Sequence, residues 1–167
     1  LDHVIVEKQL RAQADIERFK ETQGDKYNLW EWHQGGQFVV FNWRRGPFQD
    51  KRLRIAATHA IDRNAIHHAV FYGHGDMQDQ PYPAGDPWHL EGIRSLEYDP
   101  DRAKALLREA RAVGTEVKII CTANIATRPQ GAQVVQDQWK TVGFKVTVEP
   151  LDTVPLLNTR KQGAFDG

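Results

Sequence analysis

The chain has 167 residues, enough for one domain with a substantial core, and ordinary apolar and charged fractions for a globular protein. Because 22 basic residues balance 22 acidic ones, bulk charge gives no reason to expect a nucleic acid or an anionic membrane as partner. The single cysteine, Cys121, excludes an intrachain disulfide and a cysteine-based zinc site, and no apolar run reaches the roughly 18 residues of a transmembrane helix.

The first 43 residues predict a short helix followed by two strands. Apolar residues at helical spacing indicate a helix from Gln13 to Thr22, ended by Gly24. The segment 26–43 reads as two strands joined at residues 34–36, and it holds three tryptophans. These aromatic residues either fill the core and a hinge, or they line a ligand cleft, since rings give contact area with few rotatable bonds.

The stretch from Phe38 to Ile66 is the most informative part of the chain. Residues 38–41 are aromatic and β-branched, which predicts a buried strand, and Gly46-Pro47 ends it. Asp50 is then placed to cap an amphipathic helix, and Asp62 to cap a second one.

The remainder predicts a long loop and an α/β unit. Residues 72–98 are rich in proline and glycine and lack periodicity. Asp99-Pro100 opens a helix, and a strand follows at 116–121. A helix centred on Trp139 and an alternating strand from Phe144 complete a β-α-β unit, which should be parallel. A final helix from Asp152 leads into residues 163–166.

Four blocks of this chain resemble the extracytoplasmic solute-binding proteins of ABC importers, specifically the peptide/nickel-binding family. The residues that carry the resemblance are Phe41-Asn42, Pro47-Phe48, Asp50, Arg52-Leu53-Arg54, Ala56, Ala60-Ile61-Asp62-Arg63 and Ile66; Tyr98-Asp99-Pro100, Ala103 to Leu107 and Glu109-Ala110; Gln136, Trp139, Gly143-Phe144, Val146 and Asp152; and Gly163-Ala164-Phe165-Asp166.

The resemblance implies an α/β, periplasmic-binding-protein-like lobe of the class II type, with a mixed sheet and helices on both faces. Residues 36–167 would form the second lobe, truncated at its C-terminus, and residues 1–35 would lie near the crossing between lobes. With Leu1 as first residue and no visible signal peptide, we expect a fragment or processed chain.

The function that the resemblance implies is capture of a peptide or similar solute between two lobes for import. The partners would be the solute and the permease subunits, in a periplasmic or other extracytoplasmic location of bacterial type. Contact with the membrane would come only through the permease or a lipid anchor outside this chain. No enzyme activity, cofactor or metal is expected. Peptide, nickel chelate, oligosaccharide and opine all remain open as solutes.

Ligands of open parallel sheets bind beyond the carboxyl ends of the strands, which places Thr122, Ala123, Asn124 and the loop that follows them at the cleft. Helix N-terminal amides and Arg128 could hold a carboxylate such as a peptide C-terminus, or Arg128 is simply a solvated first-turn residue. Trp32, His33 and Phe38 are the candidates for an aromatic cleft wall. Thr153 stands where peptide-binding relatives commonly have an aromatic residue.

Two other functions remain as alternatives. A metal-assisted hydrolase would need His59, His67 and His74 to converge, whereas adjacent His67 and His68 lack the spacing of a His-x-x-x-His metal site. Ser95 is the only serine and has no nucleophile motif around it. A sensory or scaffold lobe that binds a protein partner would instead show a large exposed apolar patch.

Overall fold

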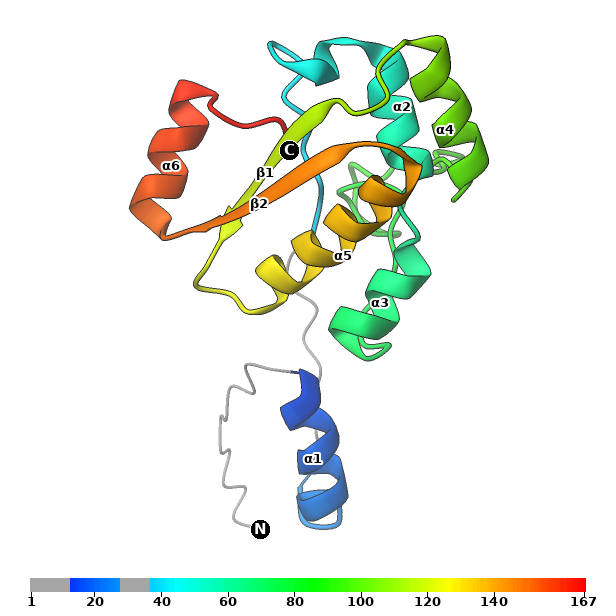
Figure 1. The fold of residues 1–167 in the computed structure, drawn as a ribbon. Coiled ribbons are helices and arrows are strands. Elements are labelled where there is room, and N and C mark those ends of the chain that lie inside the picture. Colours follow the sequence, from blue (N-terminus) through cyan, green and yellow to red (C-terminus); the bar gives the residue numbers. More distant parts are fainter. Residues whose placement is uncertain (1–12, 28–36) are drawn as a thin grey trace.

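The computed structural model describes residues 13–27 and 37–167 (Figure 1). In chain order the elements are α1 (Gln13–Gln23), the 3-10 helix η1 (Pro47–Gln49), α2 (Lys51–His59), α3 (Arg63–Phe71), α4 (Pro100–Glu109), β1 (Glu116–Thr122), α5 (Thr127–Val142), β2 (Lys145–Leu151) and α6 (Thr153–Gln162). The helices expected after Asp50, Asp62, Asp99 and Asp152 are all confirmed.

The predicted parallel β-α-β unit is present. β1 and β2 pair side by side in the parallel sense, with Val117 opposite Val146, and α5 connects them. Alternate residues of the strands, such as Val117, Ile119 and Val146, are buried in the main core cluster. The other face carries an ion pair between Lys118 and Glu149. The two strands therefore have one apolar and one polar face.

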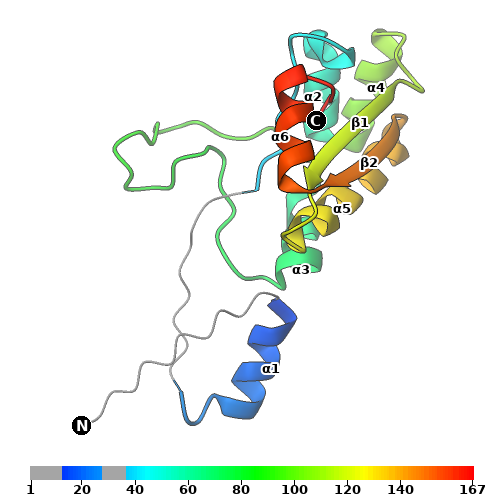
Figure 2. The ribbon, with the colours of Figure 1, turned by 90° about the vertical axis from the view of Figure 1, so that its left-hand side faces the viewer.

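The C-terminal residues lie on the other side of β1 from β2. The Asp166 amide donates to the Lys118 carbonyl over 3.0 Å, and the Ile120 amide donates to the Gly167 carbonyl over 3.0 Å. The Asn42 amide in turn donates to the Asp166 carbonyl over 2.8 Å. From β1 the chain passes through α5 to β2, on one side of β1. From β2 it returns through α6 to residues 166–167, on the other side of β1. Right-handed crossovers then put the two helices on opposite faces, and Figure 2 shows them on different sides of the strands.

The prediction of a buried strand at residues 38–41 is wrong. No strand is assigned there, and the side chains of Phe38 and Val40 are 51% and 63% exposed. Val39 and Phe41, by contrast, pack against the core. Among the described residues, the backbone hydrogen bond next to this segment joins the Asn42 amide to the Asp166 carbonyl, and none joins residues 38–41 to β1 or β2. The segment is therefore half covered rather than part of a ladder. The expected partner strand at 26–33 lies largely outside the described residues.

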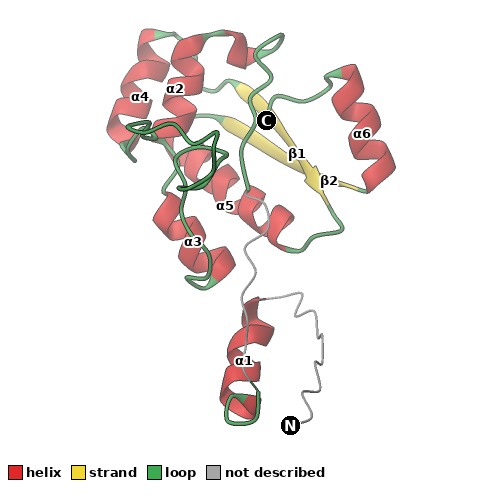
Figure 3. Cartoon of the chain, turned by 180° about the vertical axis from the view of Figure 1, so that it is seen from behind, coloured by secondary structure: helices red, strands yellow, loops and turns green. Residues whose placement is uncertain are grey.

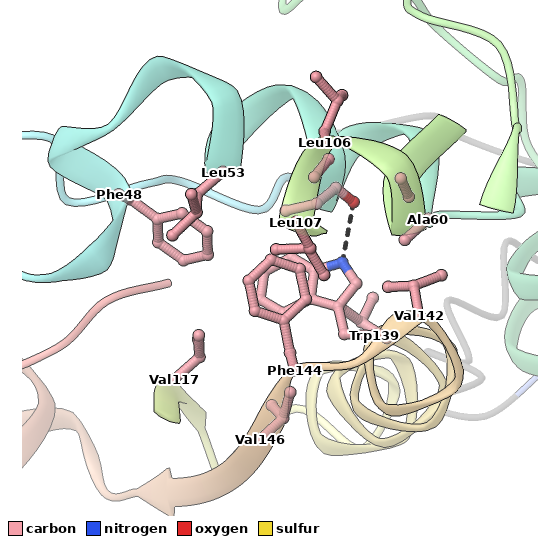
Figure 4. Close-up of a cluster of buried hydrophobic side chains, with 14 of the residues drawn as sticks. Phe48, Leu53, Ala60, Leu106, Leu107, Val117, Trp139, Val142, Phe144 and Val146 are labelled. Atoms are coloured by element: carbon pink, nitrogen blue, oxygen red, sulfur yellow. Dashed lines mark hydrogen bonds between the residues drawn. The ribbon is translucent and has the colours of Figure 1, made fainter. Parts of the chain in front are cut away.

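The core is centred on Trp139 of α5 (Figure 4). Its ring is fully buried, and the indole N–H donates to the Ala57 carbonyl over 2.9 Å. Phe48 and Phe144 pack around it, with ring centroids 5.6 and 5.8 Å away. α2 and α4 pack against each other at the same cluster. This aromatic centre joins the helical part of the chain to the sheet.

The long loop between α3 and α4 contains no helix or strand, as expected (green in Figure 3), and Figure 2 shows it projecting from the α/β body. Polar contacts hold the middle of this loop. Arg63 pairs with Asp79 over 2.9 Å, and the Gln80 side chain makes two hydrogen bonds to the backbone of Leu90. The loop is therefore braced although it lacks regular structure.

Asp50 gives the cap of α2 a pH dependence that can be measured. The Arg52 side chain, and next the Arg52 amide, donate to the Asp50 carboxylate, and both lower the pKa of Asp50 from its usual value. A lowered pKa in the folded state stabilises the fold above the ordinary aspartate pKa and loses that effect as pH falls. We expect wild type to be more stable than Asp50→Asn at pH 7, and this difference to shrink as pH drops through about 4.

Denaturant unfolding at neutral and acidic pH measures the difference, with Asp101→Asn as control because the Asp101 side chain is 92% exposed. A difference between wild type and Asp50→Asn that stays constant down to pH 3 would contradict this role for the charge.

Candidate functional site

The loops that follow β1 and β2 meet at the carboxyl edge of the sheet, on the left of Figure 1. The Ala123 amide donates to the Leu151 carbonyl over 2.8 Å. The Asn124 side-chain amide donates to the Thr153 hydroxyl over 3.0 Å, and so bridges the two loops. Asn124 therefore occupies the edge where ligands of parallel sheets bind, as the sequence predicts.

The N-termini of α5 and α6 both begin at this edge. Ala126 occupies the cap position of α5 and Asp152 that of α6, and neither makes a side-chain capping hydrogen bond. The first amides of a helix carry partial positive charge, so such ends favour a negatively charged group. Arg128 lies in the first turn of α5, which adds a cation to the same edge.

Gln37 and Thr127 meet at the start of α5, a contact that the sequence did not predict. The Gln37 side-chain amide donates to the Thr127 hydroxyl over 2.9 Å. This bond holds Gln37, which directly precedes Phe38, against the start of α5. The Gln37 side chain also lies close to the α5 backbone, because a Cβ at Gly131 would be 2.9 Å from the Gln37 side-chain oxygen. The only sequence signal was a threonine at a helix start. Its partner 90 positions away in the chain was not predictable from local pattern.

Of the candidates for an aromatic wall, Phe38 is the one that lies within the described residues. Phe38 lines a hollow with Val40, Trp43 and Pro81, and neither Asn124 nor Arg128 is among the residues that line it. Trp32 and His33 lie outside the described residues. The structure thus brings Asn124 and the N-terminus that bears Arg128 to one edge, whereas the Phe38 side chain lines the hollow with Val40 and Trp43.

The three histidines that could have formed a metal site each contact a different partner. His59 Nδ1 lies 2.8 Å from the Glu97 carbonyl, His67 Nε2 lies 3.0 Å from the Gly75 carbonyl, and His74 Nε2 lies 2.7 Å from Glu17. Within residues 13–27 and 37–167, no group of three or more histidine, cysteine or acidic side chains is arranged to hold a metal ion.

Two further findings concern chemistry and membranes. Burial raises the pKa of the Cys121 thiol, which keeps it protonated and a weak nucleophile. No helix in the described part of the chain is both long and apolar enough to cross a bilayer.

These features define a class: an α/β domain in which the N-termini of two helices lie at the carboxyl edge of a parallel strand pair, the edge at which such sheets generally bind ligands. The sequence model of a protein family, the bacterial extracellular solute-binding proteins, family 5 (middle part), matches residues 8–167. The chain belongs to this family. The resemblance read from the sequence and its implied fold class are confirmed.

Several known proteins are similar to this chain. It is similar to the dipeptide-binding protein of Escherichia coli (strain K12), with 29% identity over 90% of this chain and 29% of the relative. Heme-binding protein A of Haemophilus influenzae is 26% identical over 75% of this chain and 24% of its own. The solved structure of HbpA2 from Haemophilus parasuis is 25% identical, with a TM-score of 0.76 over 92% of this chain and 31% of that one. The chain therefore spans 24% to 31% of the length of these relatives.

Proposed function

We propose that residues 36–167 form the second lobe of a solute-binding protein that captures a peptide or a similar small solute between two lobes. Residues 1–35 lie next to the crossing between the lobes. The observation that carries the proposal is the family match over residues 8–167, together with relatives that bind dipeptides. The comparisons lend no support to the hydrolase or the scaffold alternative.

The mechanism is closure of two lobes around the solute, after which the closed form docks on the permease of an ABC importer. No bond in the solute is broken, so the protein is not an enzyme. The family is described as extracellular, which supports a periplasmic or other extracytoplasmic location. Contact with the membrane comes through the permease.

The carboxyl edge is suited to a charged end group of the solute. The α5 N-terminus and Arg128 together favour a carboxylate, and the Asn124 amide lies beside them. Thr153 supplies a hydroxyl to Asn124 where an aromatic ring would make the edge apolar. This polarity supports binding of a peptide C-terminus, or of another carboxylate-bearing solute such as heme.

The proposal is tested by Arg128→Ala in the full-length protein. Affinity for peptides with a free C-terminus should fall about tenfold or more, because a charge-assisted hydrogen bond is lost. Affinity for the same peptides with an amidated C-terminus should change little. Titration calorimetry measures both.

Arg108→Ala is the matched control, since Arg108 is an exposed arginine in the last turn of α4, away from the carboxyl edge. Equal losses for free and amidated peptides would remove Arg128 from the solute site.

A further inference from the structure

The first turn of α5 extends beyond the part of this helix that is buried in the core. The helix begins at Thr127, but none of residues 127–130 is buried, and its buried residues start at Gly131 and end at Val142. A turn that buries no side chain opens locally at low free-energy cost. Arg128 lies in this turn, so its position depends on the polar contacts made at the start of the helix.

Gln37 makes such a contact from a distant part of the chain. Its side-chain amide donates to the Thr127 hydroxyl over 2.9 Å, in a partly buried place. Because Arg128 directly follows Thr127, the bond also restricts the backbone that carries Arg128. Gln37 lies two residues before Val39, which packs against the core. The bond therefore ties the first turn of α5 to a segment that the core holds in place.

Gly131 gives a second, independent sign that the Gln37 side chain is built into this place. It lies inside α5, where glycine is less stable than alanine, and it does not have the positive φ that would call for glycine. A Cβ there would be 2.9 Å from the Gln37 side-chain oxygen. Apart from its chain neighbours and the backbone of α5, the described residues place no other atom within 4 Å of that Cβ. The glycine thus makes room for Gln37.

We propose that Gln37 is a positioning residue of the carboxyl edge: it fixes the first turn of α5, and with it Arg128, where the solute binds. The part of this inference that concerns the solute rests on the proposed function, whereas the part that concerns the helix does not. A guanidinium binds a carboxylate through directed hydrogen bonds, so its affinity depends on where the backbone holds it. Gln37 therefore affects affinity through Arg128.

Urea unfolding of the full-length protein tests the contact without any solute, in wild type, Gly131→Ala, Gln37→Ala and the double variant. In wild type the added Cβ must displace the end of the Gln37 side chain, so the lost hydrogen bond offsets the gain from alanine in a helix. In the Gln37→Ala background nothing is displaced, and Gly131→Ala should raise the urea midpoint by about 0.3 M. Equal shifts in the two backgrounds would overturn the inference.

Titration calorimetry with dialanine and its C-terminal amide tests the consequence for the solute. Gln37→Met keeps the length of the side chain but removes its donor. Affinity for dialanine should fall about fivefold, the loss expected for one neutral hydrogen bond, while affinity for the amide should change little. Gln133→Met is the matched control, because Gln133 is exposed on the same helix and its side chain donates to Gln136 and Asp137 within α5.

The two experiments separate this inference from the proposed function. Equal losses for dialanine and its amide in Gln37→Met would overturn the positioning role, and so would equal affinities of Gln37→Met and Gln133→Met for dialanine. If wild type binds neither form, the proposed peptide solute is wrong, and the unfolding comparison alone decides whether Gln37 fixes the start of α5. A loss confined to dialanine, together with unequal midpoint shifts, supports the inference.

Discussion

Replacement of Trp139 with alanine is expected to lower the free energy of unfolding by about 3–5 kcal/mol. The ring is fully buried and stacks on Phe41 with an interplanar angle of 17° and a centroid distance of 6.1 Å. Its removal leaves a cavity at the junction of α5, α2 and the sheet, and it leaves the Ala57 carbonyl without the indole donor. Equilibrium unfolding in urea measures the loss.

The matched control is Trp88→Ala, because Trp88 lies in the long loop and is 72% exposed. That substitution should change the free energy of unfolding by no more than about 0.5 kcal/mol. Similar losses at Trp139 and Trp88 would show that the aromatic cluster of Figure 4 does not dominate the stability of this lobe.

Replacement of Gly46 with alanine is expected to lower the free energy of unfolding by about 2–3 kcal/mol. Gly46 has a φ of 74°, in the left-handed region that a side chain disfavours. A Cβ there would also clash with the Asp166 carboxylate. That carboxylate cannot withdraw freely, because it accepts the Lys118 amide of β1 over 2.8 Å.

Gly75→Ala separates the two contributions. Gly75 has a φ of 84°, yet nothing lies within 4 Å of the place where a Cβ would be. It should therefore lose only the conformational part, about 1–2 kcal/mol. Thermal or urea unfolding of both variants gives the comparison. Equal losses would mean that the Asp166 carboxylate does not restrict Gly46.

These contacts give two sequence motifs a shared physical reason. The Asn42 side-chain amide donates to the Gly163 and Phe165 carbonyls over 3.1 and 2.9 Å. Asp166 then holds the β1 amide of Lys118 and lies against Gly46. Residues 42–46 and 163–166 are thus a single structural unit that places the C-terminal residues beside β1. Their side chains hold the C-terminal residues against the sheet.

The carboxyl-edge rule located part of the candidate site from sequence. A strand ending near Cys121 and a helix starting near Thr127 were enough to predict that Asn124 lies at the edge, and the structure agrees. The bridge from Asn124 to Thr153 and the contact of Gln37 with Thr127 were not predictable. They join residues 29 and 90 positions apart, and no local pattern records which polar side chains will meet.

The sequence by itself determined the helices, their aspartate caps and the β1-α5-β2 unit, because those signals are local: a capping side chain bonds an amide two or three residues away, and apolar spacing repeats within one element. Only the tertiary structure decided which side chains of residues 38–41 are buried. An apolar run predicts burial, but whether both faces are covered depends on neighbours contributed by distant parts of the chain. Here Val39 and Phe41 pack against the core, whereas Phe38 and Val40 stay exposed.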